Sequence, residues 1–209
     1  LVAFGAPQNP ILTIYNSVNN TWQSLPNGTI AASWSPNNNS RLVYLRETGS
    51  LNRLYTYDVN SKKSTEVFKT AQKDLELDWA APDLVYFKDR AAASLAGSLW
   101  SLNLKTSAFR RIINEEAGLS LKWSPSGMSA LKFSTLNRQP SLTLVNNAGV
   151  SLGNLADILT LPSKCAFNLG RLEVYCAAPD DFGPGVVLPD DYWKRKIYTA
   201  DSIYTIPLS

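Results

Sequence analysis

Residues 121–133, LKWSPSGMSALKF, carry the pattern that decides the fold. An apolar strand ends at Trp123, a Ser-Pro-Ser-Gly turn follows, and an alternating strand leaves through Leu131 and Phe133. Residues 33–45, SWSPNNNSRLVYL, repeat this arrangement, and in both copies two apolar residues stand eight and ten positions after the tryptophan. The repeat indicates one hairpin design that is used more than once along the chain.

Aromatic residues at one position of this pattern recur with a nearly constant period. Trp34, Trp79, Trp123 and Phe167 are separated by 45, 44 and 44 residues. Such a period is typical of a β-propeller, in which each repeat forms one four-stranded antiparallel blade. We expect these aromatic side chains to fill the space between adjacent blades. After Trp79 and Phe167 the turn is three residues shorter, a difference that hairpin loops can absorb.

A third and a fourth strand follow each hairpin, rich in the β-branched and aromatic residues that strands favour. Third strands are expected at 12–16, 54–58, 99–103, 142–146 and 203–207. Fourth strands are expected at 21–25, 65–68, 109–113 and 151–155. No segment has the length and periodicity of a stable helix.

The pattern predicts an all-β fold: a single β-propeller domain, or a fragment of one, over residues 1–209. About four to five blades are expected, as an open arc or as part of a larger ring. Both ends contribute a third strand, so the two partial blades do not complete each other. The chain begins at Leu1 without a signal-peptide pattern, and both features favour a mature or excised piece of a longer propeller. The expected blades are 1–27 (partial), 28–71, 72–116, 117–160 and 161–209 (partial).

Composition narrows the possible functions. With 20 basic and 17 acidic residues the net charge is only +3, so no basic stripe is available and nucleic acid is not expected as a partner. No apolar run approaches the roughly 18 residues of a membrane span. The sequence contains no histidine, which removes the commonest general base, the commonest zinc ligand and any Ser-His-Asp triad. We therefore expect neither an enzyme nor a cofactor or metal.

The longest departure from the repeat is the insertion at 177–202, AAPDDFGPGVVLPDDYWKRKIYTADS. Long loops of this kind are usually functional or disordered, and this one joins a second to a third strand on the propeller face that most often takes ligands. An aromatic-plus-charge patch suits partner binding. Alternatively, the aromatic residues tuck the loop onto the blade and the charges are solvated; a calcium site at the aspartate pairs lacks a known ligand spacing. The candidate partner-binding residues are Asp190, Asp191, Tyr192, Trp193, Lys194, Arg195 and Lys196.

The only two cysteines fall on the last hairpin. A two-residue turn at Gly170 and Arg171 would place Cys165 directly opposite Cys176, with Cβ atoms ~4.5–5.5 Å apart, near the range of a disulfide. An oxidised pair would place the protein outside a reducing cytosol, in a periplasm or on a cell surface. Two buried thiols are the alternative, because free cysteine is among the most buried residue types. The sequence leaves both open.

The WSPSG turn at 123–127 and the WSPNN turn at 34–38, each followed by a strand and then by an IY-type strand, resemble the TolB-type (WD-like) β-propeller repeat. Ser126 replaces the aspartate that usually precedes the glycine in this family, and asparagines fill the other turn. The resemblance covers nearly the whole chain. The P-DDYWKRK-x-x-x-x-DSIYTI arrangement is also similar to inserts in bacterial envelope propellers.

The resemblance implies a non-catalytic scaffold that binds a protein or peptide partner, or the rest of the same propeller, in a bacterial cell envelope. The same repeat occurs in prolyl-oligopeptidase-type hydrolases, so the alternative is the propeller domain of such an enzyme, with its catalytic domain outside these residues. A G-x-S-x-G segment elsewhere in the gene would distinguish the two. A sugar-binding or lyase propeller would need a pocket of aromatics and carboxylates. Fold alone cannot choose among them.

Overall fold

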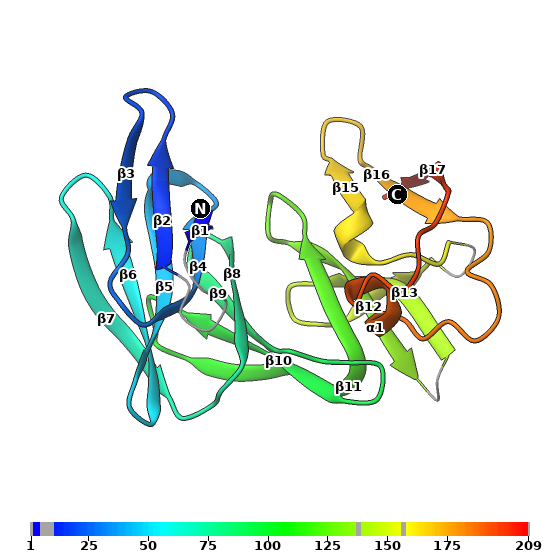
Figure 1. Ribbon diagram of the computed structural model, residues 1–209, viewed down its shortest axis with the longest axis horizontal. Helices are drawn as coiled ribbons and strands as arrows, with labels where there is room; N and C mark the ends of the chain where they lie inside the picture. The colour runs from blue at the N-terminus through cyan, green and yellow to red at the C-terminus, as the bar shows by residue number, and fades with distance from the viewer. Residues whose placement is uncertain (1, 5–10, 137–138, 156–157, 209) are drawn as a thin grey trace. The chain divides into compact units, whose positions relative to one another are not determined.

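The computed structural model describes residues 2–4, 11–136, 139–155 and 158–208 (Figure 1). These residues form antiparallel sheets, and the chain divides into two compact units, 1–89 with 101–110 and 90–100 with 111–209. Residues 5–10, between the first two strands, lie outside the described residues. The first 89 residues, which belong to the first unit, contain the strands β1 (Val2–Phe4), β2 (Ile11–Asn16), β3 (Thr21–Ser24), β4 (Thr29–Ser35), β5 (Asn38–Thr48), β6 (Leu51–Asp58), β7 (Lys63–Thr70), β8 (Leu75–Ala81) and β9 (Leu84–Asp89).

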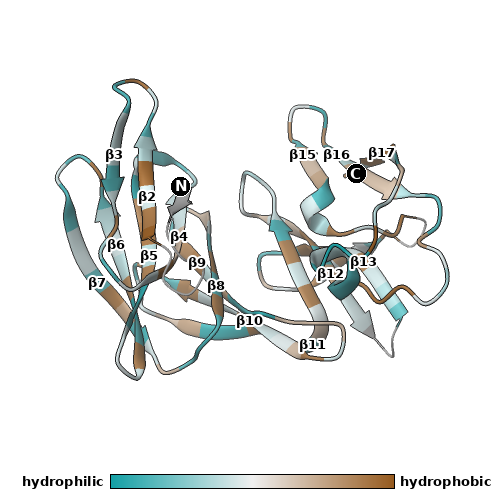
Figure 2. Cartoon of the chain, viewed as in Figure 1, coloured by the Kyte–Doolittle hydropathy of each residue, from teal (hydrophilic) through white to brown (hydrophobic). Residues whose placement is uncertain are grey.

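The first unit contains one complete four-stranded sheet, in the order β4-β5-β6-β7, and a three-stranded sheet, β1-β2-β3. Val43 of β5 is fully buried on one face of the sheet; on the other face, Leu42 is fully buried and Tyr44 is 2% exposed. These two side chains form one cluster with Ile14, Leu25 and Tyr57. Figure 2 shows the corresponding apolar segments along β2 and β5. The hairpin pattern of the sequence therefore places its two outgoing apolar residues where the core forms.

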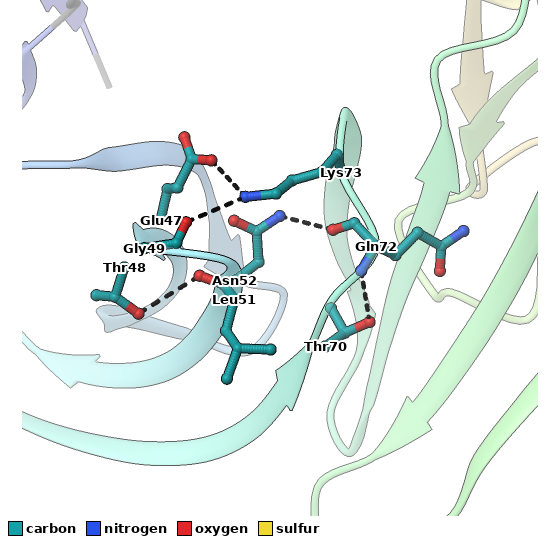
Figure 3. A network of polar contacts seen from close by, with 8 residues as sticks. All are labelled: Glu47, Thr48, Gly49, Leu51, Asn52, Thr70, Gln72 and Lys73. Carbon is teal, nitrogen blue, oxygen red and sulfur yellow. Dashed lines mark hydrogen bonds and ion pairs between the residues drawn. The ribbon is translucent and has the colours of Figure 1, made fainter.

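Polar contacts connect the β5–β6 turn to the segment that follows β7 (Figure 3). Asn52 is completely buried, and its Nδ2 donates a hydrogen bond of 2.7 Å to the carbonyl oxygen of Gln72. Beside it, the Lys73 ammonium donates to Glu47 Oε1 at 2.5 Å and to the carbonyl oxygen of Gly49 at 3.5 Å. This network fixes the path from one strand set to the next.

Two long strands pass between the units, and the second differs from the prediction. The first is β10 (Ala96–Asn103), and the second is β11 (Phe109–Trp123). We expected a fourth strand at 109–113 and a separate first strand ending at Trp123, but they form one strand of 15 residues. The bend occurs within it, because Glu115 and Gly118 have φ values of 46° and 66° and the register shifts beyond Ala117.

The second unit holds the order β11-β12-β13-β14 and a three-stranded sheet, β15-β16-β17. The register of its first hairpin differs by one residue from that of the earlier copy: Trp34 pairs with Leu42, whereas Trp123 pairs with Ala130. Leu131 is nevertheless fully buried, like Leu42. Its further elements are β12 (Ser129–Leu136), β13 (Gln139–Asn146), β14 (Ser151–Asn154), the 3-10 helix η1 (Pro162–Lys164), β15 (Cys165–Asn168), β16 (Glu173–Pro179), the helix α1 (Asp190–Trp193) and β17 (Asp201–Pro207).

The recurring aromatic residues are less buried than expected. Trp79 is 5% exposed, but Trp34, Trp123 and Phe167 are only half-buried. Trp34 and Phe167 pack at the margins of their clusters. Most residues at the centres of these two clusters come instead from the second and third strands of each sheet. These strands have neighbours on both faces of the sheet.

The core of the second unit contains residues from both of its sheets and from the insertion. Phe133, Leu142 and Val174 are buried there together with Leu188, which lies between β16 and β17 in the sequence. The two cysteines belong to the same cluster. The insertion is therefore part of the fold of this unit.

We predict that Phe133→Ala lowers the free energy of unfolding by about 3–5 kcal/mol, because a fully buried aromatic ring is removed. Leu152→Ala is the control: its side chain is 57% exposed, and we expect a change within about 0.5 kcal/mol. Urea denaturation followed by tryptophan fluorescence measures both variants. Similar small changes for both would show that Phe133 is not a core residue.

Candidate functional site

The insertion is shorter than the sequence indicated, because the flanking strands extend into it. β16 continues to Pro179 and β17 begins at Asp201, which leaves residues 180–200 as the connection, hereafter the insertion segment. It contains the single-turn helix α1, too short to leave a periodic signal in the sequence. In Figure 1, α1 lies beside β12 and β13.

Three residues of the insertion segment pack against the sheet beneath it. Leu188 is 5% exposed and belongs to the core, and Tyr192 packs against the same cluster. Pro189 is buried over Gly118, where a Cβ atom would lie 3.2 Å from Pro189 Cδ and 2.7 Å from Thr135 Oγ1. Only glycine fits at this position, which also has a positive φ. The sharp bend of β11 thus creates the seat for the insertion segment.

The two aspartates of α1 accept hydrogen bonds from backbone N–H groups, one outside the insertion segment and one within it. Asp190 Oδ1 accepts the Ala93 N–H at 2.8 Å, and Asp191 Oδ2 accepts the Val187 N–H at 2.9 Å. These backbone hydrogen bonds are the main reason why the pKa of each carboxyl lies below its usual value. Both groups are ionised at neutral pH and are used in local structure.

The lysines on either side of Arg195 are paired within the segment. Lys194 Nζ lies 3.1 Å from Asp190 Oδ2, and Lys196 Nζ lies 3.2 Å from Asp191 Oδ1. Within the described part of the chain, no group of three or more His, Cys, Asp or Glu side chains could hold a metal ion. The carboxylate oxygens that might have served calcium are engaged by N–H and ammonium donors instead.

An open pocket of about 530 Å³ lies against the C-terminal half of the insertion segment. At its base, Lys164 forms an ion pair with Asp201, donates to Thr199 Oγ1 at 3.1 Å, and places Nζ 5.3 Å from the ring centre of Tyr192. Burial acts to raise the pKa of Asp201, but the hydrogen bonds from Lys164 and Thr199 outweigh it and the pKa is lowered. The base of the pocket is therefore a satisfied charge pair.

The outer wall of this pocket is aromatic and cationic. Trp193 is 44% exposed and Tyr198 is 88% exposed. Arg195 is exposed between them, and no acidic partner for its guanidinium is found among the described residues. These three side chains are the part of the insertion that local structure does not use.

Two further pockets border the same segment. One of about 370 Å³ is lined by small and apolar residues from 185–188 together with Ala93 and Thr135. The other, of about 410 Å³, is lined by Phe182, Tyr204 and residues near them. The insertion segment therefore contributes to three concave regions of the second unit.

The candidate residues divide into two groups. Asp190 and Asp191 form internal contacts, and Lys194 and Lys196 are paired with them. Trp193 and Arg195 face the 530 Å³ pocket, and Tyr192 belongs to both groups because it packs against the core and also lines this pocket. The sequence analysis missed two contributors, Lys164 and Tyr198, because they lie outside the charged run. The aromatic residue in the KIYTADS stretch, shortly before a strand, was the signal available for Tyr198.

The cysteines face each other as the hairpin register predicted. Cys165 and Cys176 are Cα partners, and Phe167 opposes Val174. Their sulfur atoms lie 2.10 Å apart, and the two residues are 2% and 0% exposed. The structure thus holds the pair as a disulfide within the apolar core.

Comparisons with known proteins identify the fold. No protein-family model matches the sequence, and no curated protein matches it. Among solved structures, TolB from Acinetobacter baumannii matches with a TM-score of 0.59 and 12% identity over 85% of this chain and 45% of that chain. The β-propeller domain of the Trilobed protease from Pyrococcus furiosus matches with a TM-score of 0.53 and 10% identity over 85% of this chain and 54% of that domain.

Prolyl oligopeptidase B from Galerina marginata matches with a TM-score of 0.61 and 14% identity over 96% of this chain and 28% of that enzyme. This chain thus spans less than two thirds of the length of each of these proteins. The prediction of an all-β, TolB-type propeller with antiparallel blades is confirmed as a fold. None of the helices in the described residues is long and apolar enough to cross a bilayer.

We predict that acid releases the insertion segment locally. The lowered pKa values of Asp190 and Asp191 mean that their contribution is complete above the ordinary carboxyl pKa of about 3.9 and is lost as the pH falls through the lower folded values. Hydrogen exchange of the Ala93 and Val187 amides, corrected for intrinsic rates, should therefore lose protection in acid. The Leu155 amide, bonded to the Leu142 carbonyl, is the control; equal loss at all three amides would indicate global unfolding instead.

Proposed function

We propose that this chain is a non-catalytic β-propeller scaffold and that its insertion segment binds a protein or peptide partner. One observation carries the proposal: the segment borders three pockets of about 370–530 Å³ while Trp193 and Tyr198 remain exposed beside one of them. Large exposed aromatic side chains are costly in water and are enriched at the energetic centres of protein interfaces. Pockets of this size are large enough for one or a few side chains of a partner.

The anchoring of the segment supports the same function. Leu188 in the core and the Asp190 bond to Ala93 hold the backbone in place before any partner arrives. A surface that is ordered in advance loses less conformational entropy on binding than a flexible loop does. The lack of histidine in the full sequence also favours binding over general acid–base catalysis.

We further propose that the sheets of both units are blades of one propeller domain and that the protein works outside the cytosol, in a bacterial cell envelope. The opposed cysteines support this location, because disulfides persist in oxidising compartments. The resemblance of the repeat to envelope propellers points the same way. The remaining blades of the same ring would then be a second partner of this chain.

The alternative is the propeller domain of a prolyl-oligopeptidase-type hydrolase. The matched peptidases favour it to the extent that they contain the same fold within a longer chain. The two functions differ in what the gene encodes beyond these residues. A G-x-S-x-G segment on a strand–turn–helix in the same reading frame would favour the hydrolase, and its absence from the complete gene would favour the scaffold.

We predict that a random dodecapeptide display library panned on this protein yields binders that require the insertion segment. The double variant Trp193→Ala with Tyr198→Ala should weaken these binders by about 2 kcal/mol or more, as for aromatic hot spots, measured by fluorescence anisotropy. Trp22→Ala, which removes an exposed aromatic ring in the other unit, is the control and should bind normally. Binders that are unaffected by the double variant would reject the insertion segment as the binding surface.

We predict that protein isolated from its source gains about two hydrogens in mass on reduction, and that reduction lowers the free energy of unfolding by about 2–3 kcal/mol through the 11-residue loop. Intact-mass spectrometry and urea denaturation measure the two effects. Cys165→Ala with Cys176→Ala is the control and should not respond to reductant. A native mass that reductant leaves unchanged would remove the support for an oxidising location.

A further inference from the structure

We infer that the pocket formed by Trp193, Arg195 and Tyr198 recognises a carboxylate in an acidic stretch of the partner. This inference rests on the proposed function and adds the chemical class of the partner. It follows from which charges of the insertion segment are already paired and which one is not.

Among the described residues, the other charged side chains that line the pocket or flank Arg195 are paired. Lys194 and Lys196 are paired with the two aspartates of α1, and Lys164 is paired with Asp201. The acidic groups at the start of the segment border a different pocket, and each accepts a hydrogen bond. Asp180 Oδ1 accepts the Tyr204 hydroxyl at 3.0 Å, and Asp181 Oδ1 accepts the Gly183 N–H at 2.9 Å.

Arg195 is the exception among the described charges that line this pocket. It is exposed, and its guanidinium has no acidic partner within that part of the chain. Its backbone is nevertheless held, because its N–H donates to the Tyr192 carbonyl at 3.0 Å in the turn after α1. The side chain therefore starts from a fixed position and projects an unmatched positive charge.

The chemistry of the site selects a carboxylate. A guanidinium offers a planar fork of N–H donors that matches a carboxylate with two parallel hydrogen bonds. The rings of Trp193 and Tyr198 give apolar area for the side chains that flank such a residue in a peptide, and the volume of about 530 Å³ admits them. A basic peptide would find no unpaired carboxylate among the described residues that line this pocket. Nucleic acid would need several unpaired cations, and the pocket offers one.

The test repeats the dodecapeptide selection on the wild-type protein and on Arg195→Ala. We expect the wild type to enrich peptides with Asp or Glu beside an apolar residue, and Arg195→Ala to lose this enrichment. Fluorescence anisotropy should show that the strongest acidic peptide binds Arg195→Ala about tenfold or more weakly than it binds the wild type. The version of this peptide with Asn or Gln in place of Asp or Glu should bind the wild type more weakly by a similar factor. Arg195→Lys should recover only part of the affinity, because an ammonium lacks the fork.

Arg171→Ala is the matched control, since Arg171 is an exposed arginine in a turn of the same unit, and it should bind like the wild type. Thermal unfolding of each variant checks that the fold is retained, which the exposure of Arg195 leads us to expect. Raising the salt concentration should weaken the acidic peptide more than its Asn/Gln version.

The outcomes separate the two proposals. Binders that depend on Trp193 and Tyr198 but carry no acidic residue, or bind Arg195→Ala equally well, overturn the carboxylate inference and leave the partner-binding function standing. A selection whose binders are all insensitive to Trp193 and Tyr198, or that yields none, overturns both. Enrichment of basic peptides would reverse the charge of the inferred partner and so reject the inference.

Discussion

The burial of side chains on the second strand of each hairpin is the constraint on which the rest of the structure depends. Leu42 and Tyr44 in the first unit, and Leu131 and Phe133 in the second, are at most 2% exposed. Val43 and Ala130, on the opposite faces of these strands, are fully buried as well, so both faces of each strand must be covered. The turns then adjust to it: the two Ser-Pro hairpins differ by one residue in register, yet the same pair of positions reaches the core.

The same requirement explains how an insertion of polar sequence becomes an ordered part of the second unit. The bend of β11 at Gly118 opens a place where Pro189 can approach the sheet, and a side chain at that position would collide with Thr135. Leu188 then enters the core beside Phe133. Once these apolar contacts form, the aspartates of α1 can accept hydrogen bonds from the Ala93 N–H, in the connection between β9 and β10, and from the Val187 N–H of the insertion segment itself.

The sequence predicted the repeating features well and the local irregularities poorly. Periodicity gave the strands and the propeller fold, and strict pairing across one hairpin placed Cys165 opposite Cys176. It missed the continuity of β11, because two positive φ angles let an extended chain turn without a loop between strands. It missed α1, because four residues show no period. It could not tell which carboxylates would be used in the fold, because Asp190 accepts a hydrogen bond from Ala93 across 97 residues of sequence.

The structural interpretation of the insertion accounts for some of its residues, and the proposed partner binding rests on the others. Asp190, Asp191 and Tyr192 tuck the segment onto the unit, as the structural interpretation required. Their pairing removes Lys194 and Lys196 from the set of available charges, so the net positive charge of the run is concentrated at one exposed arginine. A solvated loop with the same composition would present a diffuse mixture of signs, whereas this arrangement presents a single cation between two exposed rings. In the proposed function, selectivity for one class of partner arises from the local folding of the segment, because the contacts that order it also decide which charge is left for the partner.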